Sequence, residues 1–272
     1  MATLTATGQE RVPQLLRPLQ RGLPVRSGRR YRSPDRSWWT AHTCAVMLEL
    51  IQGEGGVMAL DPDYVQAVRK LCDEKDLVLI VDEVQTGVGR TGTFLCCEHY
   101  NLKPDVVTLA KGLGGGLPIG AVLMNEKVAE GMGPGTHGST FGGNPVVCAG
   151  ANVVVDRMDQ SFLANVNERA VQLRAGIAKL PHVKSISGIG LMVGIEFYDG
   201  IKAADVLAAC REAGLLVLTA KTRLRLLPPL TLSEHDVEMA LEILGERAGA
   251  RWSRRLRRSR HETSAENERP LP

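Results

Sequence analysis

The chain is poor in aromatic side chains, which make up 4% of its 272 residues. A core must therefore be built mainly from Val, Leu, Ile and Ala, and the 44% apolar fraction is ample for one. No stretch approaches the roughly 20 apolar residues of a membrane-spanning helix. The N-terminus lacks the charged-then-apolar pattern of a secretory signal. These absences predict a cytoplasmic protein without membrane association.

Metal-binding and disulfide patterns are lacking too. The six cysteines are scattered without a C-x-x-C pair, which predicts reduced thiols. They are Cys44, Cys72, Cys96, Cys97, Cys148 and Cys210. The histidines likewise form no spaced cluster, so no metal site is expected. They are His42, His99, His137, His182, His235 and His261.

The net charge of +3 conceals two basic flanks. Residues 11–40 hold eight arginines and a single acid, Asp35, and residues 247–272 hold eight arginines and three glutamates. Neither flank contains lysine. The flanks are either nucleic-acid-binding arms or segments without a role, for example sequence translated in a shifted frame. The second interpretation is favoured, because neither flank interleaves aromatic residues at a regular spacing.

The first half of the body alternates buried strands with helices. The apolar runs predict strands at 43–50, 77–81, 106–110 and 119–124. Asp61, with Pro62 in the first turn, predicts the start of a helix that ends near Lys75. Continuous apolar strands separated by helices indicate a parallel sheet covered on both faces, with ligands at the carboxyl ends of its strands.

The second half predicts a small α+β module. Helices are expected at 146–158, 162–180 and 203–213, strands within 183–197 and at 215–218, and a last helix capped by Ser233. The expected organisation is an atypical Arg-rich segment, a partial large domain, a small α+β domain and a basic tail. Their boundaries are 1–41, 42–160, 161–246 and 247–272.

An acid and a lysine follow two of the predicted strands. The strand at 77–81 ends at Asp82, and the strand at 106–110 leads to Lys111 and a glycine-rich run. An acid at the end of a strand can bind a cationic ring. A lysine followed by glycines can offer its amine to a carbonyl compound. Either residue alone is more often a strand-capping acid or a surface lysine. Together they predict a pyridoxal 5'-phosphate site, with Lys111 as Schiff-base lysine and Asp82 as partner of the ring nitrogen.

Four blocks around this pair carry a family resemblance. Residues 48–56, 81–92, 110–116 and 137–145 resemble the class III (ornithine-type) aminotransferases in their order and spacing. Leu50 departs from the pattern, since many members carry proline there. The resemblance implies an α/β protein, with an incomplete fold type I large domain of mostly parallel sheet and a small C-terminal α+β domain.

The resemblance also implies roles for residues at the cofactor. Lys111 would hold the cofactor and then move a proton during the reaction. Asp82 would keep the ring nitrogen protonated, and Val84 would pack on the ring. Gln85 would bond the ring hydroxyl, and Glu83 belongs to the same cofactor-binding stretch.

Further residues are implied for phosphate and substrates. Thr140 would reach the phosphate of the neighbouring subunit's cofactor, so a homodimer is expected. Ser139 would contact the acylated amino acid. Arg225 would bind the α-carboxylate of 2-oxoglutarate, and Glu54 would pair with Arg225 when that carboxylate is absent. Without the family context, these four residues read as turn residues, an exposed arginine and a solvated glutamate.

The segment from 133 to 141 most resembles the branch of the family that acts on N-acetylornithine. The implied reaction moves its terminal amino group to 2-oxoglutarate, in arginine biosynthesis. Ornithine or 4-aminobutyrate as donor remains an alternative, as does a non-catalytic fragment with basic nucleic-acid-binding arms.

The family's N-terminal portion has no equivalent in this sequence. That portion supplies a phosphate cradle, an aromatic residue stacked on the ring and an arginine for the amino-acid substrate. Phosphate anchoring at a helix N-terminus contributes strongly to binding of such a ligand. The isolated chain is therefore expected to fold poorly and to have little or no activity.

Overall fold

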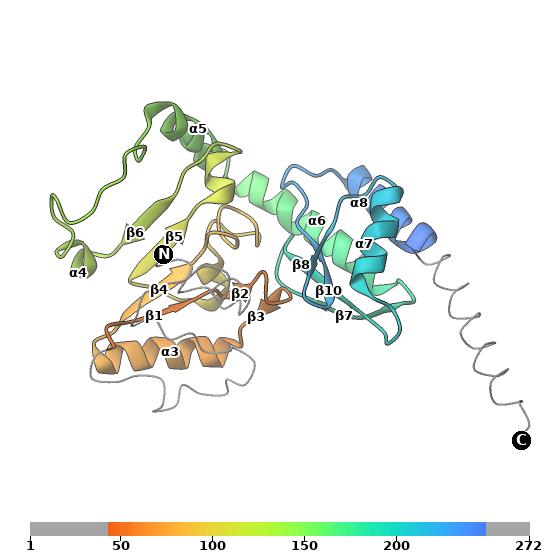
Figure 1. Ribbon diagram of the computed structural model, residues 1–272, viewed down its shortest axis with the longest axis horizontal. Helices are drawn as coiled ribbons and strands as arrows, with labels where there is room; N and C mark the ends of the chain where they lie inside the picture. The colour runs from red at the N-terminus through yellow and green to blue at the C-terminus, as the bar shows by residue number, and fades with distance from the viewer. Residues whose placement is uncertain (1–42, 249–272) are drawn as a thin grey trace, which may run out of the picture. The chain divides into compact units, whose positions relative to one another are not determined.

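The computed structural model describes residues 43–248 (Figure 1). The predicted N-terminal segment 1–41, and the basic tail from residue 249 onward, lie outside these residues. The described part of the chain contains two four-stranded sheets and one two-stranded pair. No helix in residues 43–248 is long and apolar enough to cross a membrane.

The first sheet has the strand order β1-β4-β5-β6. The strands are β1 (Ala45–Leu48), β4 (Val78–Asp82), β5 (Val106–Leu109) and β6 (Ala121–Met124). β1, β4 and β5 run parallel, with Leu48 opposite Val81 and Asp82 opposite Thr108. The carboxyl ends of these three strands therefore meet at one edge of the sheet, where ligands of parallel sheets bind.

β6 departs from the predicted parallel sheet, because it runs antiparallel to β5. The connection between the two strands holds only the short 3-10 turn η3 (Lys111–Gly114). A parallel return needs a crossover of a dozen or more residues, usually helical, and none is present between these strands. The prediction of a buried strand was also wrong here: Val122 and Leu123 are 58% and 48% exposed.

The helix predicted after Asp61 is confirmed as α3 (Pro62–Lys75). The Asp61 side chain accepts hydrogen bonds from the backbone N–H groups of the first turn, which would otherwise have no partner. Asp76 ends the helix in the left-handed conformation, with φ 54°. The buried face of α3 packs toward β4 and consists of Tyr64, Val65, Val68 and Cys72.

Shorter elements surround the first sheet. They are β2 (Ile51–Gln52), β3 (Met58–Ala59), η2 (Cys96–Tyr100), α4 (Glu126–Ala129) and α5 (Pro145–Asp156). β2 and β3 form the antiparallel pair, and α5 packs against η3. The Asn144 side chain caps α5, and Pro145 occupies its first turn. A small core cluster beneath η3 includes Val88, Leu109 and Leu113.

The second sheet is antiparallel, with the order β7-β8-β10-β9. Its strands are β7 (Val183–Ser187), β8 (Val193–Phe197), β9 (Leu218–Ala220) and β10 (Arg223–Leu226). The strand predicted at 215–218 begins only at Leu218. The reason is local: the N–H of Leu215 still bonds to the carbonyl of Cys210 and closes the preceding helix end.

Helices complete this second module (Figure 1). They are α6 (Gln160–Ala178), α7 (Ala203–Glu212), α8 (Glu234–Glu242) and the π-helical turn η4 (Ile243–Ala248). α7 packs against β9 and β10, and α6 packs against β7 and α8. Ser233 caps α8 as predicted, in a capping box with Asp236. Leu173, Ile177 and Leu224 are almost fully buried in the core, so β10 is firmly placed.

Candidate functional site

Asp82 is the last residue of β4 and is half-buried. Its Oδ1 accepts hydrogen bonds from the backbone N–H of Val84 at 2.9 Å and from the Thr108 hydroxyl at 3.1 Å. Both bonds fall on one oxygen. Within residues 43–248, Oδ2 makes no hydrogen bond and is available to accept one. A carboxylate oriented in this way fits a cationic ring N–H.

Lys111 begins η3 immediately beyond β5, at the same sheet edge as Asp82. Its backbone is left-handed, with φ 42°, and the residue is exposed. Such a conformation costs a non-glycine residue of order 1–3 kcal/mol and is found mostly where the surroundings impose it. Here the core cluster containing Leu109 and Leu113 anchors both sides of the lysine. The lysine is thereby held at an exposed position by a fixed backbone.

Glu83 points elsewhere, although the sequence places it in the cofactor-binding stretch. It is 1% exposed. One carboxylate oxygen accepts from the Thr86 hydroxyl at 2.5 Å, and the other accepts from the backbone N–H of Cys97 at 2.8 Å. Both oxygens are thus engaged by protein donors. This arrangement favours a role in holding the loop after β4, and contact with a cofactor stays an untested prediction.

Replacing Glu83 by alanine should lower the free energy of unfolding by about 2–4 kcal/mol, because two buried donors lose their acceptor. Equilibrium urea unfolding measures the loss. The control is Glu74→Ala, whose side chain is 56% exposed and whose ion pair with Lys70 spans 3.8 Å. That change should stay within about 0.5 kcal/mol of the parent chain. Equal midpoints for the two variants would contradict the assigned role.

Arg225 and Glu54 form the longest-range contact of the site. Arg225, on β10, is 7% exposed, and its Nη1 donates to Glu54 Oε1 at 2.5 Å. The same nitrogen lies 3.5 Å from Gln85 Oε1. Within residues 43–248, the buried Nε of Arg225 has no hydrogen-bond partner. The Glu54 side chain is 53% exposed, so the partner of this buried guanidinium is itself in water.

Gly53 brings the Glu54 loop close to the loop after β4. A Cβ at position 53 would lie 2.3 Å from the Gln85 side-chain oxygen. Any other residue would therefore displace Gln85 or the loop. A glycine at position 53 thus leaves this space to the Gln85 side chain.

Ser139 and Thr140 lie on an exposed loop before α5. No hydrogen bond or ion pair joins their side chains to the other candidate residues in the described part of the chain. Their neighbour Phe141 is 86% exposed. The sequence assigns Thr140 to the cofactor of a neighbouring subunit, and that role stays a prediction.

Sequence reasoning missed three residues that the structure adds to this region. Thr108 orients Asp82, and Glu49 follows β1 just as Asp82 ends β4. Arg90 donates to the carbonyl oxygens of Pro228 at 2.6 Å and Leu191 at 3.4 Å, which ties the loop after β4 to the segment beyond β10. Burial lowers the pKa of Arg90 to about 10. The register of the adjacent strands could have indicated Glu49 from the sequence. No local pattern distinguished Thr108 or Arg90.

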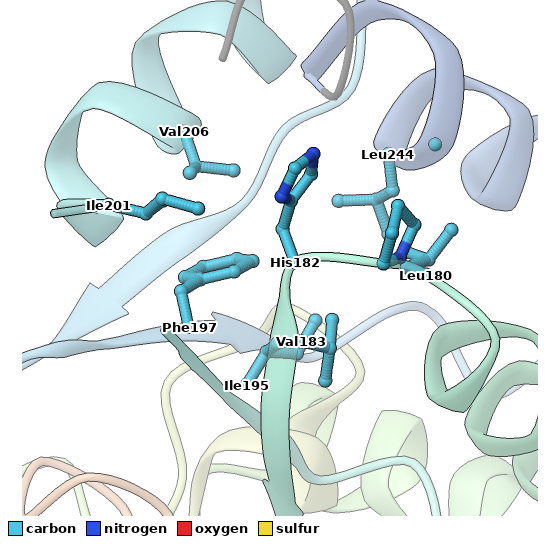
Figure 2. Close-up of a pocket in the computed structure, with 10 residues that line it drawn as sticks. Leu180, His182, Val183, Ile195, Phe197, Ile201, Val206 and Leu244 are labelled. Carbon is cyan, nitrogen blue, oxygen red and sulfur yellow. The ribbon is translucent and has the colours of Figure 1, made fainter. Parts of the chain in front are cut away.

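A pocket lies away from these residues, in the second module. Figure 2 shows it, with the imidazole of His182 among apolar side chains that include Phe197 and Leu244. None of the predicted site residues lines it. His182 is the single titratable group in the lining, so the pocket lacks the acid, amine and arginine of the candidate site. In residues 43–248, no group of three or more metal-ligating side chains is present.

Comparison with known families decides the assignment of the chain. The family model for class-III aminotransferases matches residues 29–247. The chain belongs to this family. The match includes residues 29–41, which the sequence alone assigns to the atypical N-terminal segment. Members of the family use pyridoxal phosphate, and Asp82, whose Oδ2 accepts no hydrogen bond from residues 43–248, and the exposed Lys111 fit that cofactor.

Similar proteins point to one branch of the class-III aminotransferases. The acetylornithine aminotransferase of Haemophilus ducreyi is 48% identical over 246 residues, which is 90% of this chain and 63% of that protein. That of Aquifex aeolicus is 42% identical over 90% of this chain and 64% of its own length. This chain therefore spans less than two thirds of the length of these relatives.

Solved structures share the fold. The N-acetylornithine aminotransferase of Stenotrophomonas maltophilia has a TM-score of 0.70 and 38% identity, over 77% of this chain and 57% of that one. The ornithine aminotransferase of Toxoplasma gondii has a TM-score of 0.72 and 36% identity, over 77% of this chain and 52% of that one. The predicted α/β, mostly parallel class is thus confirmed, and the division at residue 160 remains a prediction.

Proposed function

We propose that this chain carries the part of an acetylornithine aminotransferase that holds pyridoxal phosphate by its ring and binds the shared carboxylate. The reaction moves the terminal amino group of N-acetylornithine to 2-oxoglutarate, a step of arginine biosynthesis in the cytoplasm. The names of the relatives support the acetylated donor. Ornithine and 4-aminobutyrate are the alternative donors.

The observation that carries the proposal is the pairing of buried Arg225 with exposed Glu54. The reaction has two half-reactions with different ligands. The dicarboxylate 2-oxoglutarate needs a cation that binds its α-carboxylate. The amine donor reacts through its terminal amine, so an unpaired cation at the same position would repel it. A buried arginine whose partner carboxylate can swing into water serves both needs.

Asp82 and Lys111 fit the chemistry of the cofactor. When bound, pyridoxal phosphate supplies an electron-accepting ring that stabilises negative charge at the carbon bearing the amine. The free Asp82 oxygen favours a protonated ring nitrogen. Lys111 supplies the amine that captures an aldehyde, and that amine can then accept and return the proton of the substrate carbon. Val84 and Gln85 follow Asp82 on the loop after β4, where they would meet the ring face and the ring hydroxyl.

Ser139 and Thr140 complete the proposed site from a second copy of the chain. Their loop is exposed, and it carries both hydroxyls ahead of the capped helix α5. In a homodimer this loop would supply Thr140 to the partner's cofactor phosphate and Ser139 to the acyl end of the donor.

A donor panel tests the proposal. The purified chain, supplied with pyridoxal phosphate and 2-oxoglutarate, is given N-acetylornithine, ornithine or 4-aminobutyrate, and glutamate formation is measured. N-acetylornithine should give the highest kcat/KM. A preference for either other donor would refute the proposed substrate. No glutamate with any donor would refute the proposed activity for this chain.

A further inference from the structure

Glu49 stands beside Asp82 at the carboxyl edge of the first sheet. β1 and β4 pair in parallel with Leu48 opposite Val81, so the next residues in register are Glu49 and Asp82. Paired residues of neighbouring strands are about 5 Å apart and send their side chains to the same face. Two carboxylates therefore adjoin where a single one was predicted.

The Glu49 side chain also holds the loop that carries Glu54. Its Oε2 accepts a hydrogen bond from the backbone N–H of Gly53 at 3.2 Å. Gly53 is the residue that lies against the end of the Gln85 side chain. The carboxylate of Glu49 thus holds the residue that precedes Glu54 in the chain and faces the Gln85 side chain.

Charged groups of both signs face Glu49. Asp82 on β4 and Glu54 after β2 are negative, and Lys111 after β5 is positive. Although Glu49 as a residue is exposed, partial desolvation of its carboxyl group raises the pKa. The charges of Asp82 and Glu54 raise it further, while the Gly53 N–H and Lys111 oppose the rise. The folded chain therefore bears a cost for keeping this acid ionised.

We propose that Glu49 is a positioning residue of the cofactor site. Its negative charge adds to that of Asp82 in favouring a cationic ring, and its hydrogen bond to Gly53 fixes the loop that presents Glu54. The inference rests on the proposed function. A cationic ligand offsets the repulsion between the two carboxylates, which explains how an unfavourable pair can serve the site.

Two variants separate charge from loop support. Glu49→Gln keeps a side-chain oxygen for the Gly53 N–H and removes the charge, so the Kd of pyridoxal phosphate at pH 7.5 should rise about three- to tenfold. Glu49→Ala also frees the loop, and the Kd of 2-oxoglutarate should then rise as well. Fluorescence titration measures the first Kd and calorimetry the second. Glu74→Gln, an exposed change on α3, is the control and should alter neither.

Thermal unfolding gives a readout that needs no cofactor. An acid whose folded pKa is raised costs stability as pH rises through the interval above its ordinary pKa. Glu49→Gln should therefore raise the unfolding midpoint at pH 7, and the gain should shrink toward pH 4. The Glu74→Gln control should show no such pH trend.

The outcomes distinguish the two proposals. If the parent chain takes up no pyridoxal phosphate, the proposed function fails and this inference fails with it. If the parent chain binds the cofactor and Glu49→Gln binds it equally well, with an unchanged pH profile of stability, only the role of Glu49 is overturned.

Discussion

Conversion of Lys111 to arginine is expected to abolish covalent capture of pyridoxal phosphate by this chain. Borohydride reduction followed by peptide mass mapping should place the label on Lys111 in the parent chain and find none at this position in the variant. Any transaminase turnover should fall about 10²- to 10⁴-fold, the usual contribution of a positioned proton-transfer group. Arginine keeps the positive charge, but its guanidinium stays protonated and is not a nucleophile.

The structural basis is the fixed presentation of one amine. Lys111 is exposed on a left-handed backbone, at the same carboxyl edge of the sheet as Asp82. Lys103 provides the matched control, because it is an exposed lysine that precedes the other end of β5. Lys103→Arg should leave labelling of Lys111 unchanged. Comparable label on both lysines of the parent chain would mean non-selective modification and would count against the assigned site.

Removal of the Arg225 guanidinium is expected to weaken 2-oxoglutarate binding by about 2–5 kcal/mol, which corresponds to a rise in Kd of roughly 30-fold or more. The reason is that a buried, charge-assisted pair is strong, and within residues 43–248 no other cation pairs with Glu54. Arg225→Lys should recover only part of the affinity, since a lysine cannot bind a carboxylate with two parallel hydrogen bonds. Calorimetric titration measures each Kd.

Two controls accompany the Arg225 variants. Arg223 lies two residues earlier on the same strand, where it pairs with Glu196 at 2.6 Å, so Arg223→Ala should leave 2-oxoglutarate binding unchanged. Glu54→Gln removes the competing carboxylate and should tighten 2-oxoglutarate binding severalfold. If Glu54→Gln weakened the binding instead, Glu54 would be an ordinary structural partner. The proposal that the α-carboxylate of 2-oxoglutarate replaces Glu54 at Arg225 would then be refuted.

Much of the local structure follows from residue patterns. Asp61, Pro62 and Ser233 mark helix starts by capping chemistry that acts within one turn, so these predictions were confirmed. The strand that ends at Asp82 was recognisable for a similar reason, since an apolar run stops at an acid. Residue patterns failed to predict burial and strand direction where these depend on residues far away in the chain. The sequence of β6 reads as buried, yet what covers a strand and which way it runs are not encoded in its own residues.

The residues of the candidate site also fall into two groups, those that local patterns predict and those that depend on the tertiary structure. The sequence by itself determined the family, the acid at the end of β4 and the lysine after β5, because these lie in contiguous blocks whose chemistry reads locally. The family resemblance also implied the pairing of Glu54 with Arg225. Only the tertiary structure decided that Glu83 is buried against Thr86 and Cys97, that Glu49 adjoins Asp82, and that Gln85 also approaches Arg225. Except for the bond between Glu83 and Thr86, these relations join separate strands and loops. Strand register and side-chain burial set them, and neither is written in a local motif.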